Sequence, residues 1–344
     1  MDGLVDIHSH LYPRWYIDAL KRRTTPPRVV GDEGAERFVI FEGEQGRLMG
    51  DDHWDLQVKL RFMAAIGIAQ SIVSLGNPWL DPFAGDEAME LVARANADFA
   101  SFEDRTGGRI VGMGVLPQHD VRRAVETVES VAATPTLYGV ANGCRLCGLE
   151  LDDAALDPIW AALERTGLPL LLHPHYVVGR DALSGRGHAF PLALGFPFET
   201  TVAVSRLVFA GVLQRFPELK LVASHGGGTI PFLAGRLDAG WQADHGAHDG
   251  HLDAAPSEHL GKLFLDALVY HPGAVRATAA LVGTTRMAFG TDHPFTIADP
   301  AANLRAIDSG FESELDRRAV MGDSAREFFR LPAVRDEPTA LPAS

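Results

Sequence analysis

Short apolar runs recur along the chain, and the segments between them carry apolar residues at the three- and four-residue spacing of a helix. Several runs are almost continuously apolar, which is typical of parallel strands covered on both faces. The eight predicted strands are 4–7, 71–75, 110–116, 137–141, 169–172, 220–224, 263–268 and 287–289. The clearest predicted helices are 86–102, 121–133, 153–165, 199–215 and 228–240.

Eight strands that alternate with helices within 344 residues predict an α/β fold, a (β/α)8 TIM barrel with a long insertion after its first strand. A doubly wound open sheet is the alternative, but no Gly-rich phosphate loop opens the first helix. We expect residues 1–331 to form one domain and the Pro- and Ala-rich residues 332–344 to form a flexible tail.

Two segments fall outside the alternation. Residues 11–51 separate the first strand from its helix, and so long an excursion is usually a lid or a substrate-binding element. Residues 244–259 are rich in His, Asp and Gly, and we predict a solvated loop there. Its histidines are not expected to bind metal; they are His245, His248, His251 and His259.

Composition narrows the choice of partners. A hydrophobic content of 46% allows a large core, and a net charge of -14 argues against nucleic acid or an anionic membrane as the main partner. The first residues lack the basic and apolar regions of a signal peptide, and no uninterrupted apolar stretch is long enough to span a bilayer, so a cytoplasmic location is expected. The lone pair Cys144 and Cys147 is interpreted as two reduced loop residues.

Candidate chemistry begins at the end of the first strand, in the stretch Val5-Asp6-Ile7-His8-Ser9-His10. Because side chains alternate along a strand, His8 and His10 point to the same side. Two imidazoles held side by side at a strand end can bind one metal ion.

Three later strand ends carry similar residues, namely His173, His225 and Asp292. The carboxyl ends of barrel strands meet at one mouth, and buried polar groups at these positions each need a partner. We therefore assign His8, His10, His173 and Asp292 to a metal ion and leave His225 free for acid/base or polarising work.

Two details of this assignment stay open. His175 is an alternative to His173 as a ligand, although Pro174 begins the turn out of the strand and favours His173. The ligand set suits Zn²⁺ and also accepts Mn²⁺. One ion is expected rather than two, because the fourth strand and its loop contain no lysine that could bridge a second metal.

The motifs resemble those of the amidohydrolase superfamily, in the branch that contains aminocarboxymuconate-semialdehyde decarboxylase and other non-oxidative decarboxylases. The resemblance extends from His8 to about Phe329 and includes Ser224-His225-Gly226-Gly227-Gly228 and Gly290-Thr291-Asp292-His293-Pro294-Phe295. Other stretches are similar to isoorotate (uracil-5-carboxylate) decarboxylases, among them Ser74-Leu75-Gly76-Asn77-Pro78-Trp79 and Pro191-Leu192-Ala193-Leu194-Gly195-Phe196-Pro197.

The resemblance implies the same zinc ligands, with His225 catalytic. It also implies that Arg47 and Arg236 bind the carboxylates of a small-molecule substrate, with Arg236 reaching into the site of a neighbouring subunit in a homodimer. Asn77 and Phe295 would hydrogen-bond and stack on the substrate ring. His175 is placed in the substrate pocket, where the muconate enzyme has Trp, and Leu192 replaces a second Trp, so a muconate substrate is less favoured.

The predicted function is a zinc-dependent decarboxylation of a carboxylated ring or muconate-type substrate, for which a pyrimidine-5-carboxylate such as isoorotate is one candidate. Asp292 would protonate the ring carbon, and His225 would stabilise the charge that develops. The alternative is a metal-dependent hydrolase or hydratase, in which Asp292 would deprotonate a water molecule at the metal. A binding protein without catalysis is the third possibility.

Overall fold

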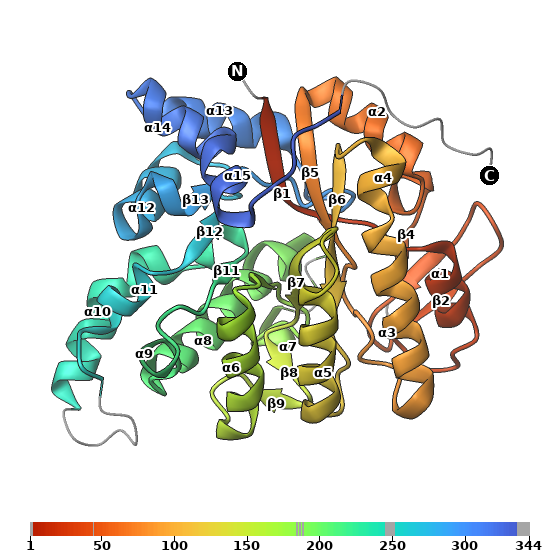
Figure 1. The fold of residues 1–344 in the computed structure, drawn as a ribbon, viewed down its shortest axis with the longest axis horizontal. Helices are drawn as coiled ribbons and strands as arrows, with labels where there is room; N and C mark the ends of the chain where they lie inside the picture. Colours follow the sequence, from red (N-terminus) through yellow and green to blue (C-terminus); the bar gives the residue numbers. More distant parts are fainter. Residues whose placement is uncertain are drawn as a thin grey trace.

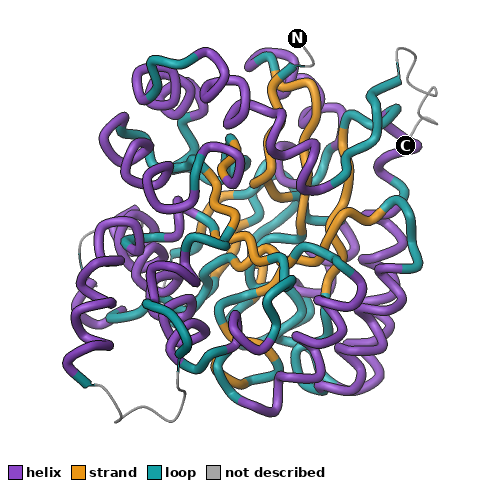
Figure 2. The backbone as a smooth tube through the Cα atoms, turned by 60° about the vertical axis from the view of Figure 1, so that its left-hand side comes forward, coloured by secondary structure: helices purple, strands orange, loops and turns teal. Residues whose placement is uncertain are grey.

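The computed structural model describes residues 3–43, 45–183, 185, 187, 189–244 and 252–335. Eight parallel strands form one sheet at its centre, and helices surround them (Figure 2). In sheet order they are β1 (Leu4–His10), β5 (Ile68–Ser74), β6 (Ile110–Val115), β7 (Leu137–Asn142), β10 (Leu170–Leu172), β11 (Leu221–Ala223), β12 (Phe264–Asp266) and β13 (Met287–Ala288). The eight predicted strands are all present.

The sheet closes on itself where the last strand meets the first. Past the short β13, Ser9 and His293 form a parallel bridge. The backbone N–H of Ile7 donates to Phe289 O at 3.0 Å, and that of His10 donates to His293 O at 2.8 Å. We call this junction the seam. The predicted (β/α)8 barrel is confirmed.

Helices follow the strands around the barrel (Figure 1). Those of the eight repeating units and the C-terminal end are α2 (Leu56–Ile66), α3 (Gly85–Ala100), α4 (Phe102–Thr106), α5 (Val121–Ala132), α6 (Asp157–Thr166), α7 (Arg180–Leu183), α8 (Phe196–Phe209), α9 (Val212–Arg215), α10 (Ile230–Ala243), α11 (Pro256–Leu260), α12 (Pro272–Val282), α13 (Pro300–Gly310), α14 (Glu314–Arg318) and α15 (Ser324–Phe329). The helix predicted at 199–215 is two helices, because Gly211 adopts a left-handed conformation (φ 68°) that ends the first.

Apolar side chains fill the barrel below the mouth. Val5, Ile72 and Val222 belong to a buried cluster that Phe329 of α15 closes. Both described ends of the chain lie at this end of the barrel, as Figure 1 shows. The polar strand ends therefore lie at the opposite, carboxyl end of the strands.

The insertion at 11–51 is more ordered than the long excursion that the sequence predicts. Its described residues form helix α1 (Arg14–Lys21) and a small antiparallel sheet of β2 (Arg28–Val30), β3 (Arg37–Val39) and β4 (Arg47–Leu48). Residue Arg47 pairs with Phe38 in that sheet and is buried. A regular sheet therefore fixes this arginine.

Other predictions concern the chain ends and loops. His259 is buried in α11 rather than solvated, with Nε2 3.3 Å from Asp253, whereas His245, His248 and His251 lie outside the described residues.

The first residues of the predicted tail contact the barrel. Pro332 O accepts from the side chain of Gln70, and the backbone N–H of Arg335 donates to Gly107 O, while 336–344 are not described. The cysteines are not disulfide-bonded; Cys144 is buried, and a small hairpin of β8 (Arg145–Leu146) and β9 (Leu149–Glu150) follows it.

One helical stretch, Pro191–Phe209, is long and apolar enough to cross a membrane, with a mean hydropathy of 1.3. It comprises the irregular turn η3 (Pro191–Gly195) and α8, and half of it is buried inside the protein. Its inward half is part of the barrel core, as expected for a helix that packs on a sheet.

Gly228 allows the turn after β11 to pass close to α8, and its replacement tests this part of the fold. It has φ 68°, and a Cβ there would lie 2.1 Å from Pro197 O. Gly228→Ala should therefore lower the free energy of unfolding by at least about 2 kcal/mol, measured by denaturant unfolding. The control Gly240→Ala, with no atom near its Cβ position, should not destabilise the protein. Equal stability of both variants would contradict this account.

Candidate active site

Three histidines at strand ends are held by their Nδ1 atoms. His8 Nδ1 lies 2.6 Å from Asp266 Oδ2, His10 Nδ1 lies 3.1 Å from Ser74 Oγ, and His173 Nδ1 lies 2.9 Å from Pro174 O. Each partner fixes the orientation of a ring and leaves Nε2 free, which is the usual arrangement behind metal-binding histidines.

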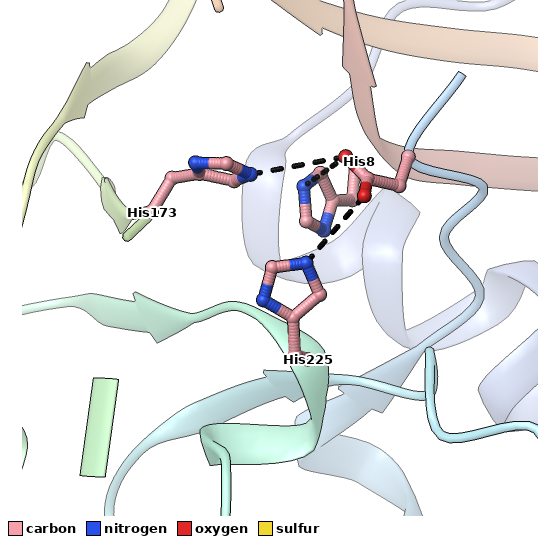
Figure 3. A group of neighbouring side chains, drawn as sticks. His8, His173 and His225 are labelled. Atoms are coloured by element: carbon pink, nitrogen blue, oxygen red, sulfur yellow. Dashed lines mark ion pairs between the residues drawn. The ribbon is translucent and has the colours of Figure 1, made fainter. Parts of the chain in front are cut away.

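The free Nε2 atoms meet around one carboxylate. Asp292 Oδ1 lies 3.4, 3.2 and 3.8 Å from the Nε2 atoms of His8, His10 and His173 respectively. Asp292 Oδ2 lies 3.6 Å from His225 Nε2. Figure 3 shows His8, His173 and His225 pointing at this common point from three separate strand ends.

The donor set fits a divalent cation. His8 Nε2, His10 Nε2, His173 Nε2 and Asp292 Oδ1 are all buried without a hydrogen-bond partner. Buried polar atoms are rarely left unpaired, and three imidazole nitrogens with one carboxylate oxygen are ligands for Zn²⁺ and related ions. The four residues predicted as ligands are therefore brought together, and a shared cation would satisfy all four atoms.

The protonation states of these four residues also favour a bound cation. Burial lowers the pKa of His173 to about 4 and that of His10 well below its usual value, so both rings are neutral. Burial opposes a charge on His8 as well, but Asp266 and Asp292 outweigh it and raise the pKa of His8 to about 10. Burial also raises the pKa of Asp292, yet the polar imidazole rings that surround it hold this pKa well below its usual range. A cation would replace the proton on His8.

Backbone strain marks the two residues predicted to be catalytic. Asp292 and His225 have φ values of 57° and 55°, which side chains with a Cβ rarely adopt. Strain of this kind persists where the surrounding structure holds it, often at active sites. Asp266 provides part of that support, because its carboxylate accepts from the backbone N–H groups of His225 and Gly226, both at 2.8 Å.

Asp266 itself was missed by the sequence analysis. It ends β12, is fully buried, and links the ring of His8 to the turn that carries His225. The available signal was an acidic residue inside the apolar run 263–268. A lone carboxylate in a predicted buried strand needs a partner.

A cavity of about 390 Å³ opens beside Asp292 and His225. Its walls are largely apolar and include Leu192, Phe196 and Phe295, and its polar lining includes Arg47 and Asn77. The Arg47 guanidinium lies 4.3 Å from the centre of the Phe295 ring, and its Nε and Nη2 atoms have no hydrogen-bond partner. Asn77 Oδ1 is also buried without a partner. These groups suit an anionic ligand that carries a hydrogen-bond donor.

Two of the residues predicted to bind the substrate do not line this cavity. The ring of His175 stacks on Phe41, with ring centres 6.3 Å apart, and meets Trp79 edge to face at 5.7 Å. His175 is not among the residues that line the cavity, so its placement in the substrate pocket is not reproduced. The chain turns at Pro174, and of His173 and His175 it is His173 whose Nε2 faces Asp292. Arg236 is exposed on α10 and does not reach the cavity of its own chain.

Comparison with known proteins places this site in a family. The family model described as Amidohydrolase matches residues 5–331. The chain belongs to the amidohydrolase family. The predicted superfamily is thus confirmed for nearly the whole chain.

Named relatives of this amidohydrolase are decarboxylases. Its structure is similar to that of Metarhizium anisopliae IDCase (isoorotate decarboxylase), with a TM-score of 0.89, 33% identity and coverage of 95% of this chain and 97% of the other. It is 26% identical to 2-amino-3-carboxymuconate-6-semialdehyde decarboxylase of Dictyostelium discoideum, over 95% of this chain and 91% of that protein.

A third similar protein contains a metal. The dihydroxybenzoic acid decarboxylase of Polaromonas sp., solved with bound manganese and the inhibitor 2-nitroresorcinol, shares the fold, with a TM-score of 0.77, 22% identity and coverage of 96% and 98% of the two chains. The predicted enzyme class, a metal-dependent carboxy-lyase, is confirmed by these comparisons, and a divalent metal is implied.

Glu199 gives this amidohydrolase a pH-dependent support for the segment that follows His173. Its carboxylate accepts from the backbone N–H groups of His175 at 3.0 Å and Val177 at 2.7 Å. Burial raises its pKa to about 7, although these backbone donors oppose the shift. Because the protonated form is favoured in the folded state, the stabilisation is complete below the unfolded pKa near 4.5 and is lost as the pH rises through 7.

The melting temperature of the wild type should therefore fall relative to that of Glu199→Gln between pH 5 and pH 8. Differential scanning calorimetry in matched buffers measures this difference. The control Glu126→Gln removes an exposed carboxylate that pairs with Arg122, and its melting temperature should follow that of the wild type. A wild type and Glu199→Gln that change in parallel would contradict the raised pKa.

Proposed function

We propose that the chain is a zinc-dependent decarboxylase that removes a carboxylate from a ring substrate, and that a pyrimidine-5-carboxylate such as isoorotate is its substrate. The observation that carries the proposal is the set of four buried atoms without partners at the barrel mouth, beside a cavity lined by an arginine whose Nε and Nη2 atoms have no hydrogen-bond partner. The decarboxylases among its relatives support the same reaction.

Zinc is proposed because the donor set is three imidazole nitrogens and one carboxylate oxygen, held by His8, His10, His173 and Asp292. Mn²⁺ is the alternative, since the same ligands accept it. When bound, the cation would act as a Lewis acid toward oxygen atoms of the substrate.

The substrate class follows from the cavity. A volume of about 390 Å³ suits a single ring with its substituents. Arg47 has two nitrogen atoms, Nε and Nη2, free to donate to a carboxylate, and Asn77 Oδ1 can accept from an N–H or O–H of the ring. Phe295 and Leu192 supply apolar surface for the ring faces. A pyrimidine with a carboxylate and ring N–H groups satisfies each of these contacts.

The reaction needs a proton at the ring carbon that bears the carboxylate. In the proposed mechanism Asp292 delivers it, because this carboxylate lies at the cavity wall and faces His225. Asp292 is ionised in the protein alone, so the proton arrives from the substrate or from water by way of His225. The bond to the carboxylate then breaks, its electron pair returns to the ring, and CO₂ leaves. His225 and Arg47 stabilise the negative charge on the ring oxygen and the carboxylate.

The roles of Asp292 and His225 are tested by Asp292→Asn and His225→Ala. Each should lower kcat by at least about 10²-fold with Zn²⁺ or Mn²⁺ present, since each removes a group that acts on the developing charge. The control Asp308→Asn changes an exposed aspartate on α13 and should keep normal turnover. Near-normal turnover of either site variant would overturn the role given to that residue.

The assay that tests the function itself is CO₂ release from isoorotate, dihydroxybenzoates and a muconate semialdehyde by the metal-loaded protein. Release from isoorotate above the others is the expected result. Absence of CO₂ release, with water added across an amide, lactone or double bond instead, would replace the decarboxylase proposal by a hydrolase or hydratase. The ion bound after loading is identified by elemental analysis.

We also propose that the working unit is a homodimer in which Arg236 contributes to the neighbouring site. Arg236 is exposed on α10, and the same helix carries Phe232 with 87% of its surface exposed. The helix α8 of the preceding barrel unit adds Phe198 and Val202, exposed by 37% and 43%. Apolar side chains gathered on neighbouring helices are typical of an interface.

Phe232→Asp should convert the dimer to a monomer, because a second copy would bury this ring. Size-exclusion chromatography with light scattering measures the mass. The control Leu315→Asp changes a side chain that is 76% exposed on α14 and should leave the dimer intact. In the intact dimer, Arg236→Ala should raise KM more than it lowers kcat. A wild type that is monomeric at assay concentrations would overturn the proposal.

A further inference from the structure

Lys59 is a fully buried cation that the proposed reaction does not use. It belongs to α2, its side chain is 0% exposed, and it does not line the substrate cavity. Its Nζ atom contacts Ser9 Oγ and lies 3.3 Å from His293 Nδ1. Among the lysines and arginines that the structure describes, Lys59 and Arg47 are the buried ones, and Arg47 opens to the cavity.

Stability alone does not explain a lysine at this position. Removing an ammonium group from water costs several kcal/mol, and an apolar side chain of similar length would fill the same volume without that cost. The partners of Nζ are a hydroxyl and a histidine ring rather than a carboxylate in direct contact. A buried charge of this kind needs a role in the surrounding structure.

The two contacts of Nζ join the segments that meet at the seam. Ser9 stands between the ligands His8 and His10 on β1, and His293 directly follows the ligand Asp292. Ser9 and His293 form the bridge that closes the barrel. One ammonium group is thus tied to both segments that deliver three of the four proposed ligands.

A second residue of α2 fixes the ring that Lys59 contacts. Phe62, one helical turn after Lys59, stacks on His293 with ring centres 3.8 Å apart and an angle of 26° between the rings. This stacking sets the plane of the imidazole. Since Nδ1 accepts from the ammonium group, Nε2 of His293 carries the ring proton. Helix α2 therefore contacts the His293 ring on its face through Phe62 and at its Nδ1 edge through Lys59.

The charge of Lys59 also acts on the carboxylates near the metal position. Asp6 and Asp292 are both close enough to interact electrostatically with the ammonium group. Asp6 accepts from Thr291 N and Oγ1 at 3.1 and 2.8 Å, next to Asp292 in the chain. In a buried region these attractions are weakly screened. They pull the segment of Asp292 toward β1.

We propose that Lys59 is a positioning residue of the metal site, which holds the Asp292 segment against β1 through Ser9 and His293. It touches neither substrate nor the proposed ligands, and it acts by setting the distance between Asp292 and the imidazoles of His8 and His10. The inference rests on the proposed metal site. The set of unpaired donor atoms at the barrel mouth supports that site independently of Lys59.

The test is Mn²⁺ binding to Lys59→Met, with free Mn²⁺ followed by electron paramagnetic resonance. Methionine keeps the length of the side chain and removes its charge. The dissociation constant for Mn²⁺ should rise by about 10–100-fold, the usual effect of losing a residue that orients metal ligands. Ser9→Ala, which removes one contact and keeps the charge, should give a smaller rise. The melting temperature of each variant is measured in parallel.

The matched control is Gln70→Met. Gln70 is also buried, and its side-chain amide donates to Gly108 O and Pro332 O at the far end of the barrel. It should lower the melting temperature without changing Mn²⁺ affinity. A Lys59→Met variant with the wild-type affinity for Mn²⁺ would overturn the inference. If Lys59→Met does not fold, Ser9→Ala decides, and wild-type affinity in that variant overturns it.

The same titration separates this inference from the proposed function. A wild type that binds Mn²⁺ but releases no CO₂ would end the decarboxylase proposal, whereas a change in Mn²⁺ affinity in Lys59→Met would still support the role of Lys59. A wild type that binds neither Mn²⁺ nor Zn²⁺ would overturn both.

Discussion

The structure of the barrel mouth depends on the different surroundings of the two nitrogen atoms in each histidine ring. In His8, His10 and His173, Nδ1 contacts an oxygen atom of the protein. The Nε2 atom of each ring is buried and points at Asp292 without a hydrogen-bond partner. An unpaired polar atom that is buried costs about 1–3 kcal/mol. The ligand-free fold is therefore destabilised at this point, and a divalent cation that binds there stabilises it. The proposed metal-dependent function rests on that imbalance.

The sequence located residues of the barrel mouth where the signal was local. His8 and His173 each follow an apolar run directly, and the alternation of a strand or the position of Pro174 tells which side chain faces the mouth. Asp266 and Lys59 gave no comparable local signal, because their partners are far away in the chain. His8 is 258 residues from Asp266, and His293 is 234 residues from Lys59. Only the closed barrel brings such partners together.

The insertion shows a different limit of prediction. The match to related sequences pointed to Arg47, and this residue does lie at the cavity. The two- and three-residue strands around it, β2, β3 and β4, are too short for a periodic pattern to be recognised. They form because Phe38 packs into the core and pairs with Arg47 across the small sheet. The position of this arginine was therefore predictable by resemblance, and its support was not.

Arg47 and Lys59 would explain how an acidic protein could bind the anionic substrate that we propose. The protein's net charge of -14 repels anions at long range, but that field is screened over about 8–10 Å in salt. Inside the mouth the balance is different, because Arg47 lines the cavity and Lys59 lies behind the seam. The first cation is free to meet a carboxylate. The second is enclosed and interacts with Asp6 and Asp292, so it offsets charge that the protein itself has buried. The charge of Lys59 thus helps to hold Asp292 in place, and the charge of Arg47 keeps the cavity attractive to an anion.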